Sequence, residues 1–149
     1  MKSIFNHEHN GELLSRLEQI TSETKPQWGK MNASQMILHC QKPLDVAEGT
    51  LPLPFSLMGK LFGKIFKRKF LKSCDLGRNA PTVKEFRIVE TPEFNKEKAV
   101  LQSQIRRFGE IGPDVVANKT HPFFGTMNDD EWGQLQYIHL NHHFTQFGV

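Results

Sequence analysis

The sequence predicts an all-α fold, and two kinds of observation support that prediction. Apolar residues recur at intervals of three and four in several separate segments, which is the period of a helix with one buried face. Two of these segments are preceded by the pattern of a capping box, Asn32 with Gln35 and Asn128 with Glu131. Only the stretch 83–89 partly alternates, so a short extended piece is the one expected departure from helix.

The composition is that of one soluble globular domain. The 149 residues are 38% hydrophobic and 23% charged, and the formal net charge of +3 is too weak to indicate a nucleic-acid partner. Cys40 and Cys74 are the only cysteines, which suits reduced thiols in the cytoplasm. No signal peptide and no bilayer-spanning run is recognisable. We therefore expect a single cytoplasmic domain covering residues 1–149.

Two predicted helices follow the polar N-terminal segment. Asn10 is the expected cap of the first helix, whose apolar stripe consists of Leu13, Leu14, Leu17 and Ile20. The second helix begins after Asn32 and should bury one face, formed by Met36, His39, Cys40, Leu44 and Ala47. Pro43 lies four residues after His39, so the carbonyl group of His39 cannot receive its usual helical hydrogen bond.

The stretch from Phe55 to Lys72 combines an apolar side with the densest positive charge in the chain. Its apolar side consists of Leu57, Met58, Leu61, Phe62, Ile65, Phe66 and Phe70. No acidic residue lies between its basic residues, which are Lys60, Lys64, Lys67, Arg68, Lys69 and Lys72. Such a helix could lie on an anionic membrane, meet an acidic ligand or guide an anionic cosubstrate, but a solvated face over a packed helix explains the pattern equally well.

Two further helices complete the predicted fold. The third begins at Thr91-Pro92-Glu93, with Pro92 at its first position, and ends near Gly109 or Gly112. The last begins after Asn128, and its broad inner face is formed by Trp132, Leu135, Gln136, His139, Leu140, His143, Phe144 and Phe147. His139 and His143 therefore lie within a core stripe, which for a polar residue requires a reason.

The histidines of the last helix carry the strongest chemical signal. His139 and His143 are four residues apart, so their rings rise from one helix face and can hold a divalent cation at two points. His39 is the candidate third ligand, although a lone buried histidine is more often a core residue satisfied by one hydrogen bond. Three neutral imidazoles would leave a fourth position open to water or to a thiol, which would lose its proton near neutral pH.

Other polar residues near these positions have more than one interpretation. His142 could replace His143 as the partner of His139, support the site, or face solvent. His121 and Gln146 could support a substrate or ligand; a loop histidine that caps the backbone and a polar residue at a fraying helix end are the ordinary alternatives. Cys40 points away from His39 around the helix and is interpreted as a small buried hydrophobic residue.

Three blocks of sequence resemble one family. They are Trp28 to His39, His121-Pro122-Phe123-Phe124-Gly125, and Glu131-Trp132-Gly133 through His139 and His143 to Gln146-Phe147-Gly148. Together they resemble the DUF1569 branch of the DinB/YfiT-like superfamily, with a poor match from Leu51 to Glu90. The resemblance implies an up-down-down-up four-helix bundle, with the amphipathic segment between its second and third helices. It also implies a metal held by His39, His139 and His143.

The same resemblance implies a class of reaction. Characterised members of the superfamily include thiol-dependent transferases and isomerases, and dimers are common among them. Relatives often have Arg-Gly-Gln after the last ligand, whereas this chain has Phe144-Thr145-Gln146 and lacks that arginine. We therefore expect a zinc- or nickel-dependent homodimeric enzyme with a small-molecule substrate, either a transferase that uses a low-molecular-weight thiol or a hydrolase. The alternative is a non-catalytic, metal-stabilised bundle that binds an anionic surface or partner through Lys60 to Lys72.

Overall fold

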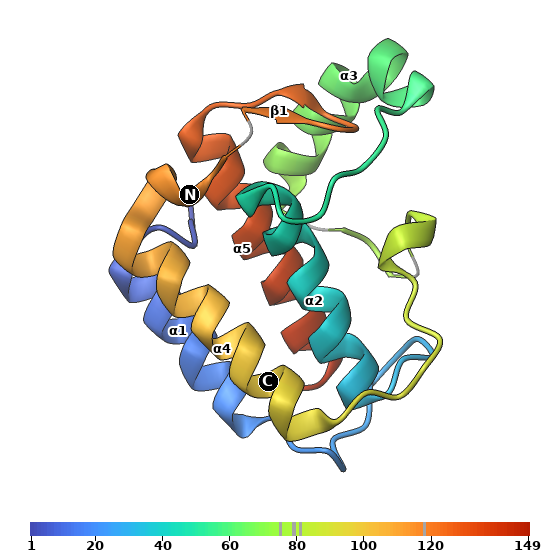
Figure 1. Cartoon of the computed structure of the whole chain (residues 1–149), viewed down its shortest axis with the longest axis vertical. Helices are drawn as coiled ribbons and strands as arrows, with labels where there is room; N and C mark the ends of the chain where they lie inside the picture. The colour runs from blue at the N-terminus through green and yellow to red at the C-terminus, as the bar shows by residue number, and fades with distance from the viewer. Residues whose placement is uncertain (75, 79, 81, 118) are drawn as a thin grey trace.

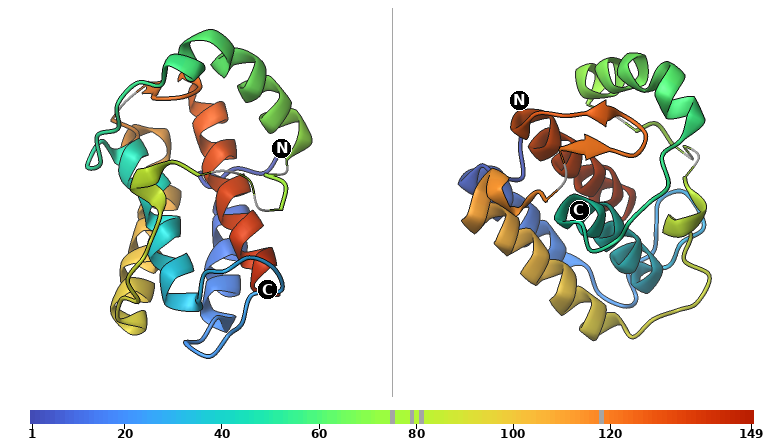
Figure 2. Two further views of the ribbon diagram at one scale, coloured as in Figure 1. Left: turned by 90° about the vertical axis from the view of Figure 1, so that its right-hand side faces the viewer. Right: turned by 45° about the horizontal axis from the view of Figure 1, so that its top comes forward.

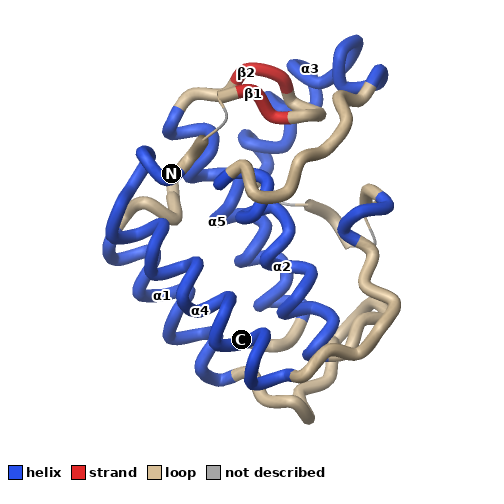
Figure 3. Tube along the Cα trace, in the orientation of Figure 1, coloured by secondary structure: helices blue, strands red, loops and turns tan. Residues whose placement is uncertain are grey.

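The computed structural model describes residues 1–74, 76–78, 80, 82–117 and 119–149, and this part of the chain is mostly helical (Figure 1). Its α-helices are α1 (His7–Gln19), α2 (Ala33–Glu48), α3 (Leu57–Ser73), α4 (Phe94–Ile111) and α5 (Asp129–Gln146). Two 3-10 helices lie in the connections, η1 (Lys84–Phe86) and η2 (Gly112–Val115). The strands β1 (Thr120–His121) and β2 (Gly125–Thr126) form a small antiparallel hairpin, drawn in red beside α3 in Figure 3. The predicted helical fold is confirmed.

The helices α1, α2, α4 and α5 enclose the hydrophobic core. α4 packs against α1 and α2, and α5 packs against the same two helices (Figure 2). The largest fully buried side chains are Trp132 and Phe144 of α5 and Phe108 of α4. Because buried residues occur on most sides of α5, this helix is held in the core around most of its circumference. The core therefore fixes the direction in which the histidines of α5 point.

The helix starts are partly as predicted. Both capping boxes form, with Asn32 and Asn128 as the N-caps of α2 and α5. The prediction for α1 is wrong: its cap is Asn6, while Asn10 is buried inside the helix. The Asn10 side-chain amide donates to the carbonyl groups of Ile4 and Ile105, at 2.9 and 2.7 Å. A buried asparagine that satisfies two carbonyls is thus part of the core and not of a helix end.

Two details between α2 and α5 also differ from the prediction. α4 begins at Phe94 after its N-cap Glu93, so Pro92 precedes the cap and is not the first helical residue. The Glu93 carboxylate accepts hydrogen bonds from the backbone N–H groups of Asn95 and Lys96, which satisfies donors that the first helical turn leaves unpaired. The extended piece considered at 83–89 does not pair as a strand, and η1 occupies its middle.

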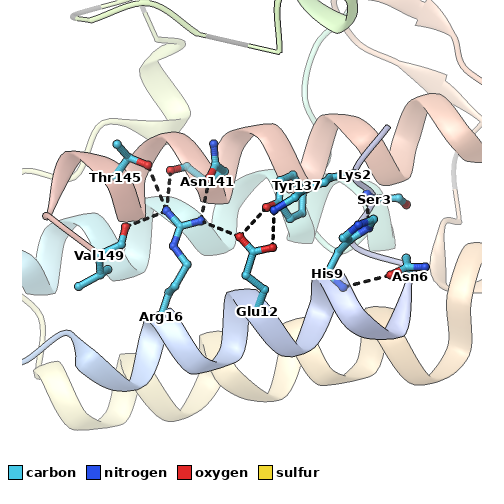
Figure 4. A network of polar contacts seen from close by, with 10 residues as sticks. All are labelled: Lys2, Ser3, Asn6, His9, Glu12, Arg16, Tyr137, Asn141, Thr145 and Val149. Atoms are coloured by element: carbon cyan, nitrogen blue, oxygen red, sulfur yellow. Dashed lines mark hydrogen bonds and ion pairs between the residues drawn. The ribbon is translucent and has the colours of Figure 1, made fainter.

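A row of polar contacts joins α1 to α5 (Figure 4). The guanidinium group of Arg16 donates to Asn141 Oδ1 at 2.7 Å and to the carbonyl of Val149 at 2.8 Å. Asn141 is two residues away from both His139 and His143, which places it about 200° around the helix from either. The contact between Arg16 and Asn141 therefore turns both histidines away from α1.

The helix α3 packs through its glycines. Gly59 and Gly63 are its buried residues, and a Cβ atom at either would overlap the carbonyl oxygen of Phe123 in the β1–β2 turn. Lys67 Nζ is 2.7 Å from Glu131 Oε1 and donates to the carbonyl of Thr126 at 2.9 Å. The interpretation of this stretch as a solvated face over a packed apolar side is wrong, because most of the large apolar side chains face outward. No described helix is long and apolar enough to cross a membrane.

Candidate metal centre

Three histidines from two helices form one cluster. His39 comes from α2, and His139 and His143 come from α5. One ring nitrogen of each lies within 4.8 Å of the corresponding nitrogens of the other two. The Nε2 atoms of His39 and His139 are 3.2 Å apart, and the ring of His143 is centred 4.6 Å from that of His39. The packing of α2 against α5 thus brings together the three histidines singled out in the sequence.

The cluster is largely enclosed by protein. His39 and His143 expose only 5% and 7% of their surface, and His139 is partly buried. Pro43 lies inside α2 and its carbonyl accepts a hydrogen bond from Gln136 Nε2 of α5 at 3.3 Å. Polar contacts of this kind hold the two helices together next to the cluster.

Hydrogen bonds define which nitrogen of His39 faces the cluster. His39 Nδ1 is 2.8 Å from the carbonyl oxygen of Phe86, which can only accept, so Nδ1 carries the proton. Its Nε2 atom then presents a lone pair to His139. This is the tautomer in which a metal-binding histidine donates its outer N–H to a carbonyl.

His143 is oriented in the same way by Gln146. Gln146 Nε2 donates to the carbonyl of Trp28 at 2.7 Å, which fixes the orientation of the amide, and Gln146 Oε1 then accepts from His143 Nδ1 at 2.9 Å. Gly29, at φ 85°, allows this approach, because a Cβ atom there would overlap Gln146 Nε2. Gln146 is buried at the end of α5 and both polar atoms of its amide are hydrogen-bonded, so it supports the cluster through His143.

The ring nitrogens of the three histidines are not all satisfied. His139 Nδ1 is buried and has no hydrogen-bond partner among the described residues. The contact between His139 and His39 requires a proton or a cation between the two Nε2 atoms, because two facing lone pairs repel at 3.2 Å. Three imidazole nitrogens this close together match the donor set that divalent zinc or nickel prefers. The residues present therefore fit a divalent cation.

Burial keeps all three imidazoles neutral near pH 7. It lowers the pKa of His139 well below its usual range, and the neighbouring histidines lower this pKa further. Burial, followed by the proximity of His39, lowers the pKa of His143 to about 3. Burial also lowers the pKa of His39, although its hydrogen bond to Phe86 partly offsets this effect. The neutral ring is the form that binds a metal, so the site is prepared for a cation without the loss of protons.

His142 lies beside the cluster and not in it. Its ring meets the rings of His143 and Trp28 edge to face, with centroid distances of 5.0 and 6.0 Å. It lines a cavity of about 150 Å³ whose other lining residues are Trp28, Cys74, Arg78, Asn141 and Thr145. His142 therefore both contacts the ring of His143 and lines this cavity.

His121, a candidate supporting residue, and Cys40, interpreted as a buried hydrophobic residue, both make structural contacts. His121 Nδ1 accepts the backbone N–H groups of Phe123 and Phe124, at 3.1 and 3.2 Å, so this histidine shapes the turn between β1 and β2. Burial lowers the pKa of His121 to about 4. Cys40 is fully buried with its Sγ 3.5 Å from Met36 Sδ, and burial raises the pKa of its thiol. Its interpretation as a small hydrophobic residue agrees with these contacts.

Sequence reasoning missed the groups that orient the histidines. Two of them are backbone carbonyls, those of Phe86 and Trp28, and a carbonyl has no signature in the identity of its residue. Arg78 was also missed; its guanidinium carbon lies 4.4 Å from the centre of the Trp28 ring, at the wall of the cavity next to His142. A lone arginine in a connection gives no signal that it will stack on a particular tryptophan.

Two helices that present three neutral histidines to one point define a helical protein with a candidate metal centre. The chain belongs to the family described as "Protein of unknown function (DUF1569)", whose family model matches residues 4–148. No curated protein and no solved structure matches the chain. The family predicted from the sequence blocks is confirmed, and the match extends through the stretch from Leu51 to Glu90.

Proposed function

We propose that this protein is a divalent-metal-dependent enzyme in which His39, His139 and His143 hold zinc or nickel. The observation that carries the proposal is the cluster of three neutral imidazoles, in which one ring nitrogen of each lies within 4.8 Å of those of the other two. Three protein ligands leave one position of a tetrahedral site available to a reactant, which is the arrangement of catalytic and not of structural zinc sites. A structural site would more often be closed by a fourth protein ligand.

The reaction we propose is group transfer from or to a small thiol, with hydrolysis as the second candidate. A divalent cation at this site would supply Lewis-acid activation of a thiol or of a water molecule. Because the three ligands are neutral, they leave the charge of the cation uncompensated, which favours an anionic group such as a thiolate beside it. The cavity lined by Arg78 and His142 offers a small-molecule substrate a place next to the cluster.

The finer classification of the fold belongs to the same proposal. We assign α1, α2, α4 and α5 to a DinB/YfiT-like bundle of up-down-down-up topology, with α3 as an insertion and residues 1–149 as one domain. The mutual contacts of these four helices and the position of the histidines on the second and last of them support the assignment. The free thiols Cys40 and Cys74 support a cytoplasmic location, and we expect a homodimer by analogy with the superfamily.

Elemental analysis of protein purified without a histidine tag tests the metal centre. We expect about one zinc or nickel ion per chain in the native protein and almost none in His39→Ala, His139→Ala or His143→Ala. His7→Ala removes an exposed histidine outside the cluster and should retain the metal. Metal content that is negligible in the native protein, or that survives all three cluster variants, would contradict the proposal.

A reaction screen distinguishes the candidate activities. Metal-loaded protein is incubated with several low-molecular-weight thiols and an electrophile, and separately with ester and amide substrates in the absence of thiol. Turnover that requires both the thiol and the metal supports the transferase, whereas thiol-independent cleavage supports the hydrolase. Stoichiometric metal with no turnover in either assay would favour the non-catalytic, metal-stabilised alternative.

A further inference from the structure

The outer side of α3 is an apolar surface that the rest of the described chain leaves uncovered. We call it the α3 outer face and define it as Phe55, Leu57, Met58, Leu61, Phe62, Ile65 and Phe66. Leu57 and Leu61 expose 79% and 73% of their surface. Single exposed apolar residues are ordinary, but a continuous set at helical spacing marks an interaction surface.

Specific contacts hold α3 in this orientation. The two glycines face the β1–β2 turn because only a residue without a side chain fits against the carbonyl of Phe123. On the same side, Lys67 is paired with Glu131. Figure 2 shows α3 at the edge of the molecule, outside the layers formed by the other helices. The large apolar side chains therefore face outward because the inner side of the helix is already occupied.

The α3 outer face is surrounded by unopposed positive charge. The exposed basic residues of the helix are Lys60, Lys64, Arg68, Lys69 and Lys72. None of them forms an ion pair with a residue that the structure describes. The sequence from 51 to 72 contains no aspartate or glutamate. Apolar and cationic groups thus share one exposed surface.

We propose that the α3 outer face docks on the surface of an anionic lipid membrane. The apolar side chains would enter the boundary between headgroups and acyl chains, and the lysine and arginine side chains would meet the anionic headgroups. Both parts of the surface are then satisfied by one partner, because apolar burial and electrostatic attraction add in the binding of an amphipathic helix to such a membrane.

Each of the two simplest other occupants leaves one part of the surface unsatisfied. A second copy of the chain, seated face to face on the same surface, would bring Lys64 and Arg68 of both copies together with no acidic residue of either helix between them. A nucleic acid would neutralise the lysines but would leave Leu57 and Leu61 exposed to water. Of the three occupants compared, the lipid surface satisfies both the charge and the apolar area.

Co-sedimentation of the protein with vesicles tests this proposal. We expect binding to phosphatidylcholine vesicles that contain phosphatidylserine, a decrease in this binding as salt is added, and weak binding to phosphatidylcholine alone. The variant K64E/R68E/K69E should bind on the order of 100-fold more weakly. The control K25E/K84E/K96E changes the net charge by the same amount at exposed positions outside α3 and should bind like the native protein.

A second variant isolates the apolar contribution. L57Q/L61Q/I65Q should also weaken vesicle binding, while circular dichroism shows unchanged helix content because glutamine is a good helix former. The control V83Q/V89Q/V100Q replaces three exposed valines elsewhere and should leave vesicle binding unchanged. His139→Ala should bind vesicles like the native protein, so a failure of the metal centre and a failure of membrane docking are distinguishable.

Three results would overturn the proposal. They are the absence of binding to anionic vesicles at low salt, equal binding to neutral vesicles, and equal losses in the α3 variants and their controls. Light scattering, which measures the oligomeric state, provides a fourth result that would overturn the proposal. A dimer of native protein that becomes a monomer in L57Q/L61Q/I65Q would assign the α3 outer face to a second copy of the chain.

Discussion

The Nε2 atoms of His39 and His139 lie 3.2 Å apart although 100 positions separate the two residues in the chain. His143 follows His139 by one helical turn, so α5 supplies two histidines of the cluster and α2 supplies the third. The cluster consequently exists only when α2 and α5 are packed. A cation bound there should stabilise the whole fold and not one helix alone.

Metal should therefore raise the free energy of unfolding. With free zinc at about 100 times its dissociation constant, we expect a gain of about 2.7 kcal/mol over the chelated protein, because the ion binds the folded chain alone. Urea unfolding followed by circular dichroism, with zinc and with a chelator, measures this gain. His139→Ala should show no gain, and identical midpoints for the native protein under both conditions would contradict the prediction.

Gln146→Leu should weaken metal binding without removing a ligand. The substitution leaves His143 Nδ1 without its acceptor, and loss of such an orienting partner typically lowers metal affinity roughly 10- to 100-fold. Titration calorimetry with zinc measures the change. Gln146→Glu keeps an oxygen acceptor for His143 and should lose less affinity; equal affinities for both variants and the native protein would show that Gln146 orients nothing.

Gly63→Ala should loosen α3, because the new methyl group would overlap the carbonyl oxygen of Phe123. We expect a destabilisation of roughly 1–3 kcal/mol, as for other overpacked sites. The matched control is Gly11→Ala in α1, where a Cβ atom has no neighbour within 4 Å. Alanine there should stabilise by about 0.5–1 kcal/mol. Denaturant unfolding of both variants measures these changes in the free energy of unfolding. Equal changes in Gly63→Ala and Gly11→Ala would mean that α3 does not pack through Gly63.

His121 should make the stability of the protein depend on pH. Its pKa is about 4 in the folded chain and 6.5 in the reference state, so the folded state binds fewer protons than the unfolded state between these values. Stability is lost as pH falls from 6.5 to 4, by about 3 kcal/mol from this residue alone. His121→Asn keeps an acceptor for the turn and removes the titration.

The pH dependence of unfolding free energy measures this contribution. Between pH 6.5 and 4 the decrease in stability should be about 3 kcal/mol smaller in His121→Asn than in the native protein. His7→Asn is the matched control, because it makes the same substitution at an exposed histidine outside the β1–β2 turn. Parallel curves for all three proteins would show that His121 is not held neutral by burial.

Sequence reasoning located the cluster because its residues follow the helical period. His139 and His143 share a face with Leu135 and Phe147, and His39 shares one with Met36, so their burial could be predicted once the helices were placed. The support around the cluster could not be predicted in the same way. It depends on where the carbonyls of Phe86 and Trp28 come to lie, and only the path of the backbone decides that.

The errors in the predicted fold have a related cause. A hydrophobic pattern identifies the apolar side of a helix, but it does not say whether that side or a pair of glycines meets the next element. In α3, Gly59 and Gly63 approach the backbone of Phe123 more closely than any larger residue can, and this close approach decides the orientation. For α1, Asn6 and Asn10 are equally good cap residues, and the carbonyls of Ile4 and Ile105 draw Asn10 into the core.

Because α3 packs against the β1–β2 turn through its glycines, different constraints apply to the residues on its inner and outer sides. The inner side must keep Gly59 and Gly63, whereas the side chains at 57, 61 and 65 touch no part of the core. Substitutions at those three positions can change what the surface attracts while the bundle and the histidine cluster stay as they are. The binding specificity of the α3 outer face can thus evolve, or be engineered, independently of the histidine cluster.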